Sequence, residues 1–515
     1  MQSQDHGSTP GMTQAKENRA FEFDAASRRS SKCSKSSVDM SRPFFNPTGL
    51  NWFVTGLFVV GDLAGGGLVA LPTAIIQSEF YPGLIMCSIM IIVVTYTAYV
   101  LGLSWNILLD TWPEYRHHCR KPYPEIGARA MGPFVGSLVS ACIDVTQFGI
   151  AVVYLLLASK NIQNMIMAFW GVNITFCVLV LIVAACLLPI TFLKSPQDFW
   201  WAVVIAMMTT SAAVIMIIVG SIIDLPTCSP IKQMPPFTIT NIFLAMGTFL
   251  FSVGGHSAFP TIQHDMKHPK EFTKSVALAF SIMACMYIPV CIMGYVVYGD
   301  SLRDSIIPSI QTVWIQQVIN ILITVHCILT LTIVFNPLNQ EVEEFFDVPQ
   351  KFCIQRVLVR SGIMVAVVFV AESVPTFGPL LDLVGGSTLT LTSVILPCLF
   401  FLYLEAHRKK EEQLGLKGTP PVCIKEVWAY NNQTTLVICC TIIVIGLIGG
   451  GCATFSAIVE LTSTQFNMPC YVAPFLHKSA TNTSTAQTNC CGPLQDISIF
   501  NNTALCSPTQ LNFYN

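Results

Sequence analysis

Charged side chains are scarce in this sequence. Asp, Glu, Lys and Arg make up 11% of the 515 residues, whereas they make up about a quarter of a typical soluble domain. Hydrophobic residues make up 53%, and the mean hydropathy is +0.60. The net charge of −2 offers no basic surface to nucleic acid. This balance predicts an all-α polytopic membrane protein surrounded by lipid, and it argues against a nucleic-acid partner.

Sequence motifs of several other classes are also missing. No glycine-rich phosphate loop occurs, so we do not expect the chain to hydrolyse nucleotide or to be an enzyme. The His-His-Cys group at 117–119 lacks the spacing of zinc ligands, so we expect no metal and no cofactor except a coupling ion. The first forty residues are polar and lack the apolar core of a cleavable signal peptide. Residues 1–47 are therefore predicted to be a disordered cytosolic tail.

Long apolar runs fill most of the remaining sequence. About twenty apolar residues are needed to cross the hydrocarbon core of a bilayer. Eleven such runs lie near 50–76, 83–109, 134–158, 173–193, 199–223, 238–262, 274–297, 313–335, 357–374, 380–404 and 435–459. They predict eleven transmembrane helices in a domain at 48–460, followed by a tail at 461–515.

The positions of Lys and Arg predict the orientation of these helices. Eleven crossings put the two ends of the chain on opposite sides of the membrane. Basic residues gather in the connectors on the side of the N-terminus, while those on the far side are only Lys160, Lys232, Arg303 and Lys478. Cytosolic connectors carry an excess of basic residues. The N-terminus is therefore predicted to be cytosolic and the C-terminus extracellular or luminal, in the plasma membrane or in an endolysosomal or vesicular membrane.

The tail at 461–515 has the composition of a segment in an oxidising compartment. Asn482 and Asn501 each begin an Asn-x-Ser/Thr sequence, which predicts N-glycosylation. The tail also contains Cys470, Cys490, Cys491 and Cys506, and Cys228 lies in another far-side connector. These five cysteines are candidates for disulfides whose pairing the sequence leaves open. The alternative is a disordered tail with unpaired thiols.

Two of the apolar runs contain a glycine cluster followed closely by proline. The first reads GDLAGGGLVALP at 61–72, and the second reads SVGGHSAFP at 252–260. Backbone groups freed by a helix break inside a bilayer must face protein or a wet cavity. Paired interruptions in the two halves of a chain are typical of a transporter's substrate site. The alternative for each cluster by itself is close packing between helices.

A broken helix offers hydrogen-bond groups that match a zwitterion. Free amide N–H groups suit a carboxylate, and free carbonyl groups suit an ammonium group or a small cation. A small amino acid carries both charges and is the predicted substrate. The candidate substrate-binding residues at the two breaks are Asp62, Ala64, Gly65, Gly66, Gly67, Gly254, Gly255 and His256.

Four motifs in order resemble the amino acid/auxin permease family. They are GGGLVALP at 65–72, PYPEIG at 122–127, GGHSAFPTIQ at 254–263, and the pattern of Tyr295, Tyr298 and Gly299. This resemblance covers about 48–460. It implies the fold of the amino acid–polyamine–cation superfamily, a leucine-transporter-like inverted five-plus-five repeat with broken helices 1 and 6 and one added helix. It also implies proton- or sodium-coupled amino acid transport.

Ionisable residues inside the predicted spans are functional candidates by default. Asp62 is expected to be either a proton acceptor or the counter-charge of a substrate ammonium group, and the alternative is a helix-capping acid in a wet vestibule. His256 is expected to bind substrate or relay a proton, and the alternative is a structural hydrogen bond.

Other polar residues face the substrate path only if the resemblance holds. Asp144 and Gln147 share one face of the third helix, which lines that path in this fold. Thr324 and His326 on the eighth helix, with Thr330, could face the first break, where related folds place sodium. The alternative for the threonines is a bond to their own helix backbone.

Together these features predict a secondary active transporter of small neutral or related amino acids. It is expected to act as a monomer by alternating access, with H⁺ or Na⁺ as the coupling ion. The alternative is an amino acid sensor that binds without appreciable flux and signals through its cytosolic tail.

Overall fold

The helices follow the apolar runs of the sequence. The computed structural model describes residues 43–117, 119–172, 174–192, 200–349, 353–415, 418, 421–464, 469–472, 490–492, 497–498 and 513. Almost all of the predicted tail at 1–47 lies outside these residues. Residues 44–515 form one unit by contacts, and the rest of this section concerns that unit.

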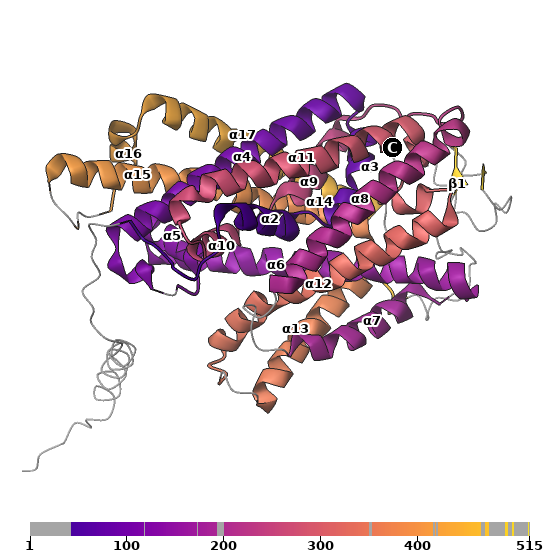
Figure 1. Cartoon of the computed structure of the whole chain (residues 1–515), viewed down its shortest axis with the longest axis horizontal. Coiled ribbons are helices and arrows are strands. Elements are labelled where there is room, and N and C mark those ends of the chain that lie inside the picture. Colours follow the sequence, from indigo (N-terminus) through magenta and orange to yellow (C-terminus); the bar gives the residue numbers. More distant parts are fainter. Residues whose placement is uncertain are drawn as a thin grey trace, which may run out of the picture. The chain divides into compact units, whose positions relative to one another are not determined.

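The elements of this unit are almost all helical (Figure 1). The first half contains α2 (Trp52–Leu63), η1 (Gly66–Val69), α3 (Leu71–Gln77), α4 (Phe80–Thr111), η2 (Pro113–Arg116), α5 (Pro122–Met131), α6 (Pro133–Trp170), α7 (Phe176–Thr191) and α8 (Trp200–Cys228). The second half contains α9 (Ile239–Val253), α10 (Phe259–His264), η4 (Pro269–Glu271), α11 (Phe272–Val297), η5 (Gly299–Ser301), η6 (Ile307–Ser309), α12 (Val313–Phe345) and α13 (Ile354–Ser373). The last part contains α14 (Phe377–Val384), η7 (Gly385–Leu389), η8 (Leu391–Ile395), α15 (Leu396–Leu414), α16 (Ile424–Tyr430), α17 (Gln433–Val459), η9 (Glu460–Thr464), β1 (Cys490–Cys491) and β2 (Ile497–Ser498).

Eight of the described helical segments are long and apolar enough to cross a membrane. Three shorter apolar helices accompany them, namely α2, α7 and α9. Each of the eleven predicted runs coincides with a described helix or with consecutive helical segments, and the runs at 50–76 and 238–262 each contain two separate helices. The predicted all-helical membrane fold is therefore confirmed for the described residues, apart from the short antiparallel pair of β1 and β2.

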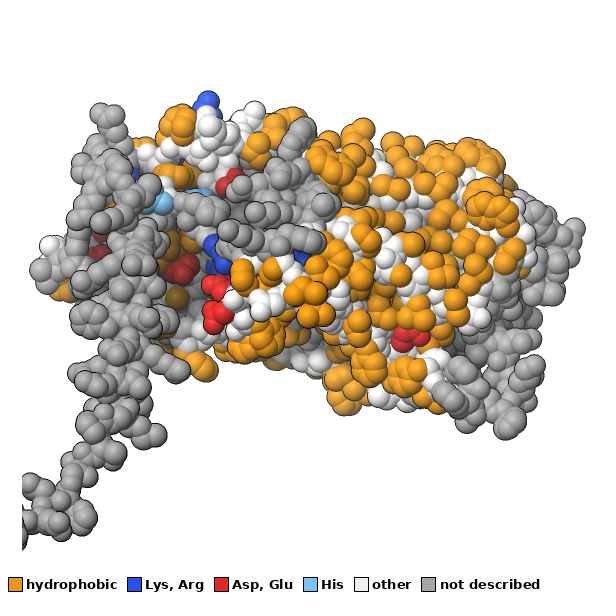
Figure 2. Space-filling model, turned by 90° about the horizontal axis from the view of Figure 1, so that it is seen from below, with side chains coloured by type: hydrophobic (Ala, Val, Ile, Leu, Met, Phe, Trp, Pro, Cys, Tyr) orange, Lys and Arg blue, Asp and Glu red, His pale blue; other side chains and the backbone are white. Residues whose placement is uncertain are grey.

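Apolar side chains cover the outside of the bundle as well as its core. Figure 2 shows hydrophobic side chains over most of the described surface on one face, with most of the visible Lys, Arg, Asp and Glu toward one end. Large exposed residues on membrane-facing helices include Ile85, Phe134, Ile215 and Phe455. Such a surface is unfavourable in water, and it matches the hydrocarbon of a bilayer.

Several helices extend beyond their predicted ends. Asn161, Gln163 and Asn164 interrupt the apolar pattern of the third run, so the predicted span stops at 158. In the structure α6 continues to Trp170, because these polar side chains are buried in the protein. The Nε2 atom of Gln163, for example, donates to the carbonyl oxygen of Ile174 at 2.9 Å. Hydrophobicity alone therefore underestimates a helix end that is covered by protein.

Helices of the two halves pack closely against each other. α2 contacts α8 and α11, while α3, the continuation of the same run, contacts α9 and α11. α12 lies between α6 and α8. This arrangement brings the interruption in the first half beside the interruption in the second half. We call the ends of the helices that meet Cys470 and Cys491 the tail side of the protein.

The cysteines on the tail side correct one prediction. Cys470 forms a disulfide with Cys177 at the start of α7, with 5.6 Å between their Cα atoms. The expectation that Cys470 pairs within the tail or with Cys228 is wrong, because its partner is Cys177. Cys177 lies in an apolar run that predicts a membrane helix, so the sequence does not suggest it as a disulfide partner. Cys228 and Cys491 are both buried, and their thiols contact each other.

The remaining calls on the tail lie outside what the structure describes. Asn482, Asn501 and Cys506 are not among the described residues, and Cys490 is described only as backbone of β1. Both glycan sites and the pairing of these two cysteines stay predictions.

The Cys177–Cys470 disulfide predicts a specific change in thiol reactivity. Cys177→Ser removes the disulfide partner of Cys470, so a maleimide added after unfolding without reductant should label Cys470 in the variant and not in the wild type. Peptide mass spectrometry without reduction measures this labelling. Cys186→Ser, which removes an exposed unpaired cysteine of the same helix, is the control and should leave Cys470 unlabelled. Labelling of Cys470 in the wild type would contradict the disulfide.

Candidate substrate site

The first apolar run contains two helices with a non-helical step between them. α2 ends at Leu63, and α3 begins at Leu71 with Pro72 in its first turn. Between them the chain passes Ala64 and Gly65 and makes the single 3₁₀ turn η1. Proline is tolerated at a helix start because its missing N–H has no partner there. The interruption leaves several backbone groups outside the helical hydrogen-bond ladder.

Neighbouring side chains lie too close to this step for any residue larger than glycine. A Cβ atom on Gly66 would stand 2.6 Å from Cε1 of Tyr154 on α6. A Cβ atom on Gly65 would overlap the imidazole of His326 on α12. Glycine is needed at both positions because the backbone itself is in contact with its neighbours.

Two buried tyrosines meet the amide groups at this step. The amide of Gly66 lies beside the Tyr154 hydroxyl and acts on it, and the amide of Gly65 does the same at the Tyr287 hydroxyl. Tyr154 lies on α6 and Tyr287 on α11, and both side chains are buried. Phenol oxygens are therefore the polar groups that face amides which would otherwise lack partners inside the bundle.

The carbonyl group at the end of α2 connects to a buried histidine. Thr210 on α8 donates from Oγ1 to the Ala64 carbonyl oxygen at 3.2 Å, and the same Oγ1 lies 2.9 Å from Nδ1 of His326. Nδ1 also lies 3.2 Å from the Ala206 carbonyl oxygen, which can only accept, so Nδ1 carries a proton. Nε2 then accepts from Thr330 Oγ1 at 3.2 Å. These bonds hold the His326 ring beside the first break.

The second interruption lies between α9 and α10. α9 ends at Val253, and α10 begins at Phe259. The segment between them packs against η7, the first of two π-helical turns between α14 and α15. A Cβ atom on Gly254 would stand 3.2 Å from Cδ2 of Leu389 in that turn. π-helical turns inside a longer helix often occur at functional sites.

The two interruptions are in direct contact with each other. A Cβ atom on Gly67 would stand 2.8 Å from Cα of Ser252, and one on Gly255 would stand 3.5 Å from Oδ2 of Asp62. The Tyr287 hydroxyl donates to the Ser252 carbonyl oxygen at 3.0 Å. One tyrosine thus contacts both breaks.

Asp62 and His256 have different surroundings. Asp62 is half-buried beside the second break, and its charge acts on Tyr154. His256 is 0% exposed and contacts α4, where its Nε2 lies 3.1 Å from the Val94 carbonyl oxygen and 3.0 Å from Thr97 Oγ1. Its Nδ1 has no hydrogen-bond partner among the described residues. Asp62 therefore faces the meeting point of the breaks, whereas His256 joins the segment between α9 and α10 to α4.

Asp144 and Gln147 lie on α6 well before Tyr154. Asp144 is half-buried, and its electrostatic neighbours are Lys121 and Glu341, which form an ion pair at 2.6 Å. The helical rise of about 1.5 Å per residue puts Asp144 on the order of 15 Å from Tyr154 along the axis. Gln147 lies between them, and its Oε1 has no partner in the described part of the chain. The structure does not bring Asp144 to the breaks.

Thr324 and His326 lie on opposite sides of α12. Residues two positions apart are separated by about 200° around a helix, so only one of them can face the first break. That residue is His326, and the Thr324 hydroxyl has no hydrogen-bond partner among the described residues.

Sequence reasoning missed four residues that surround the breaks. They are Tyr154, Thr210, Ser252 and Tyr287, all of them buried. Their only sequence signal is a hydroxyl group within an apolar run, and many such groups bond their own helix instead. Identifying them requires the rotation of each helix, which the sequence does not specify.

Comparison with known proteins points to one family. The family described as "Transmembrane amino acid transporter protein" matches residues 48–449. Amino acid transporter AVT1D of Arabidopsis thaliana is 25% identical over 422 residues, covering 78% of this chain and 68% of the relative. Amino acid transporter AVT1J of the same plant is 23% identical over 393 residues, covering 72% and 87%. Lysine histidine transporter-like 1 is 23% identical over 409 residues, covering 71% and 83%.

A solved structure has a similar fold. The crystal structure of MhsT in complex with L-phenylalanine aligns with a TM-score of 0.52, at 13% sequence identity. The alignment covers 80% of this chain and all of that one. At this identity the likeness concerns the arrangement of the helices only.

The close packing at the first break predicts a strong effect of side-chain size. Gly66→Val should destabilise the protein by about 1–3 kcal/mol, the usual cost of overpacking a filled site. Thermal unfolding of the purified protein measures this loss. Gly362→Val is the matched control, because a Cβ atom there meets nothing within 4 Å, and it should leave the melting temperature almost unchanged. Equal shifts for the two variants would contradict the described packing.

Proposed function

The chain belongs to the transmembrane amino acid transporter family, and from that premise we propose that it is a secondary active transporter of small neutral or related amino acids. The observation that carries this proposal is the contact between two interrupted helices, one in each half of the chain. Interrupted helices that meet near the middle of a bundle are the usual site of substrate binding in such transporters.

The substrate is proposed to bind between the two breaks. Its carboxylate would take the amide groups of Gly65 and Gly66, beside which the hydroxyl groups of Tyr154 and Tyr287 now lie. Its ammonium group would lie beside Asp62, next to the second break. The tyrosine hydroxyl groups face the amides while the site is empty, so binding exchanges one set of polar contacts for another.

The proposed architecture has eleven membrane crossings in an inverted five-plus-five repeat with one added helix. The helix positions and the likeness to a solved transporter fold support it. The N-terminus is proposed to be cytosolic and the tail side extracellular or luminal. The distribution of Lys and Arg supports this orientation, and so does the Cys177–Cys470 disulfide, because disulfides persist in oxidising compartments. Function as a monomer in the lipid bilayer is part of the same proposal.

Coupling to a proton or sodium gradient is proposed, and the surroundings of the first break favour protons. The Ala64 carbonyl oxygen already accepts a hydrogen bond from Thr210. The space beside it is taken by the imidazole of His326, whose Nδ1 donates rather than accepts. A sodium ion at this point would require oxygen ligands that are free to turn toward it.

Flux measurements in proteoliposomes test the proposed function. The purified protein should accumulate at least one amino acid from a radiolabelled mixture of the standard protein amino acids when an ion gradient is present. Repeating the assay at two pH values, with and without sodium, identifies the coupling ion. Binding of an amino acid without any flux or exchange would contradict the proposal and would favour a sensor.

The proposed role of Asp62 predicts a selective loss of affinity. Asp62→Asn should raise the KM for the transported amino acid by about tenfold or more, since removing one member of a charge pair typically costs at least 1.4 kcal/mol. Asp144→Asn is the matched control, because Asp144 lies in the separate charged group with Lys121 and Glu341. Initial uptake rates at several substrate concentrations measure both. An equal rise in both variants would contradict this assignment of roles.

A further inference from the structure

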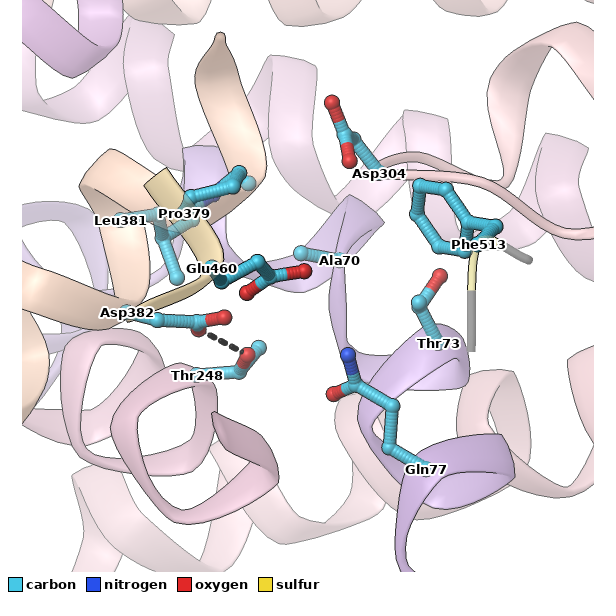
Figure 3. Close-up of a pocket in the computed structure, with 11 residues that line it drawn as sticks. Ala70, Thr73, Gln77, Thr248, Asp304, Pro379, Leu381, Asp382, Glu460 and Phe513 are labelled. Atoms are coloured by element: carbon cyan, nitrogen blue, oxygen red, sulfur yellow. Dashed lines mark hydrogen bonds between the residues drawn. The ribbon is translucent and has the colours of Figure 1, made fainter. Parts of the chain in front are cut away.

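A cavity on the tail side of the two breaks contains three carboxylate groups. Figure 3 shows Asp304, Asp382 and Glu460 around it. Asp304 lies in the loop after α11, Asp382 lies on α14, and Glu460 begins η9. The volume open to the centre of a water-sized sphere is about 20 Å³, which is room for about one water molecule. An amino acid does not fit into this space, whereas a water molecule or a proton-bearing group does.

The three carboxylates line one buried cavity, and their negative charges act on one another. Asp382 is 4% exposed and Glu460 is 5% exposed, and Asp304 is half-buried. The charges of Asp304 and Asp382 both act on Glu460, and that of Asp304 acts on Asp382. Like charges in one buried place favour a state in which at least one of the carboxylates keeps a proton.

Among the described residues, two positively charged side chains act on Asp304. Lys160 and Arg303 both act on this carboxylate, and it also accepts a hydrogen bond from the Gly378 amide. Burial nevertheless raises the pKa of Asp304, against these three opposing influences. Thr248 donates a hydrogen bond from Oγ1 to Oδ1 of Asp382.

A buried amide provides a second, independent observation. The side chain of Gln77 on α3 is 7% exposed, and in Figure 3 its amide points into the cavity toward Glu460 and Thr248. Its Oε1 atom has no hydrogen-bond partner among the described residues. In Figure 3 the amide nitrogen of Gln77 points toward Glu460 and Oε1 points toward the side of Thr248, whose hydroxyl donates to Asp382. A buried acceptor without a partner requires a donor in the cavity. A protonated carboxyl group or a bound water molecule supplies that donor.

The cluster is not arranged as a metal cage. Within the described residues, the only three Asp, Glu, His or Cys ligand atoms that lie within 4.8 Å of one another belong to Cys177, Glu372 and Cys470. The three carboxylates of the cavity are therefore spread too widely to hold one ion together. A proton needs no such convergence.

The cavity is lined by the tail-side halves of both interrupted helices. Thr73 and Gln77 lie on α3, and Thr248 lies on α9. Thr73 donates from Oγ1 to the Arg303 carbonyl oxygen at 2.5 Å, which ties α3 to the loop that carries Asp304. A change of protonation in the cavity alters groups that contact α3 and α9, and hence the two breaks.

We propose that Asp304, Asp382 and Glu460 form the site at which the coupled proton is exchanged with the tail side of the membrane. In each exchange one carboxylate oxygen forms an O–H bond with a proton from water on that side, and the same bond breaks when the proton leaves. This inference rests on the proposed transport function. It assigns proton exchange to the cavity and leaves Asp62 as the counter-charge of the substrate.

The test separates proton coupling from substrate movement in proteoliposomes that contain a trapped pH-sensitive dye. Asp382→Asn and Glu460→Gln keep the shape of the side chains, and the amide oxygen introduced by Asp382→Asn would still accept the bond from Thr248. Both variants should lose proton-driven accumulation of the radiolabelled amino acid mixture, and the associated pH change, by about tenfold or more, a size typical of coupling between two sites. Exchange of labelled for unlabelled amino acid without a gradient should change far less.

Two control variants make this test specific. Glu372→Gln removes a buried carboxylate of the tail side that does not line the cavity, and it should retain proton coupling. Glu460→Asp keeps a carboxyl group and should retain most of the pH change.

The outcomes distinguish this inference from the proposed function. A wild-type protein that neither accumulates nor exchanges any amino acid would contradict the proposed function itself. A wild type that transports, with Asp382→Asn and Glu460→Gln retaining the full pH change, would overturn the inference. Coupling of the wild type to sodium alone would overturn it as well. Loss of exchange together with proton coupling in both variants would also overturn it, because the carboxylates would then serve substrate binding or folding.

Discussion

Backbone groups that leave a helix inside a membrane must find their partners within the protein. At the first break those partners are hydroxyl groups from three other helices. Tyr154 and Tyr287 meet two amides, and Thr210 meets the carbonyl oxygen of Ala64. Because α6, α8 and α11 must all approach the same few residues, this requirement determines how closely these helices pack around α2. The glycines then follow, since a Cβ atom would separate the backbone from its new partners.

The same contacts suggest how binding could be connected to movement. Tyr287 contacts both breaks, because its hydroxyl lies beside the amide of Gly65 and donates to the Ser252 carbonyl oxygen. A substrate that takes the amide of Gly65 would release this tyrosine from one break while it stays bonded to the other. On the tail side, α3 and α9 line the carboxylate cavity, so the halves of both helices that would move also contact the proposed proton site. Substrate and proton would then act on the same two pieces of structure.

The sequence predicted the membrane helices and the two interruptions because each depends on local properties. Long apolar runs indicate spans, and glycine followed by proline indicates a break. The partners of the breaks depend on helix rotation, which apolar runs leave undefined because all faces are hydrophobic. Thr324 and His326 looked equivalent in the sequence, yet only His326 can face Gly65. Cys177 was not a disulfide candidate because it lies in an apolar run that predicts a membrane helix. The carboxylate cavity was beyond reach, since Asp304, Asp382 and Glu460 come from segments far apart in the chain.

The central claim is that an amino acid binds where the two interrupted helices meet. An experimental density map of the protein in a lipid nanodisc, recorded with a saturating mixture of the standard protein amino acids, tests it most directly. The account predicts additional density between Gly65 and Gly255, beside Asp62, with the Tyr154 and Tyr287 hydroxyl groups moved away from the amides. Two continuous helices in place of the breaks, or amino acid density elsewhere with the tyrosines still beside the amides of Gly65 and Gly66, would contradict it.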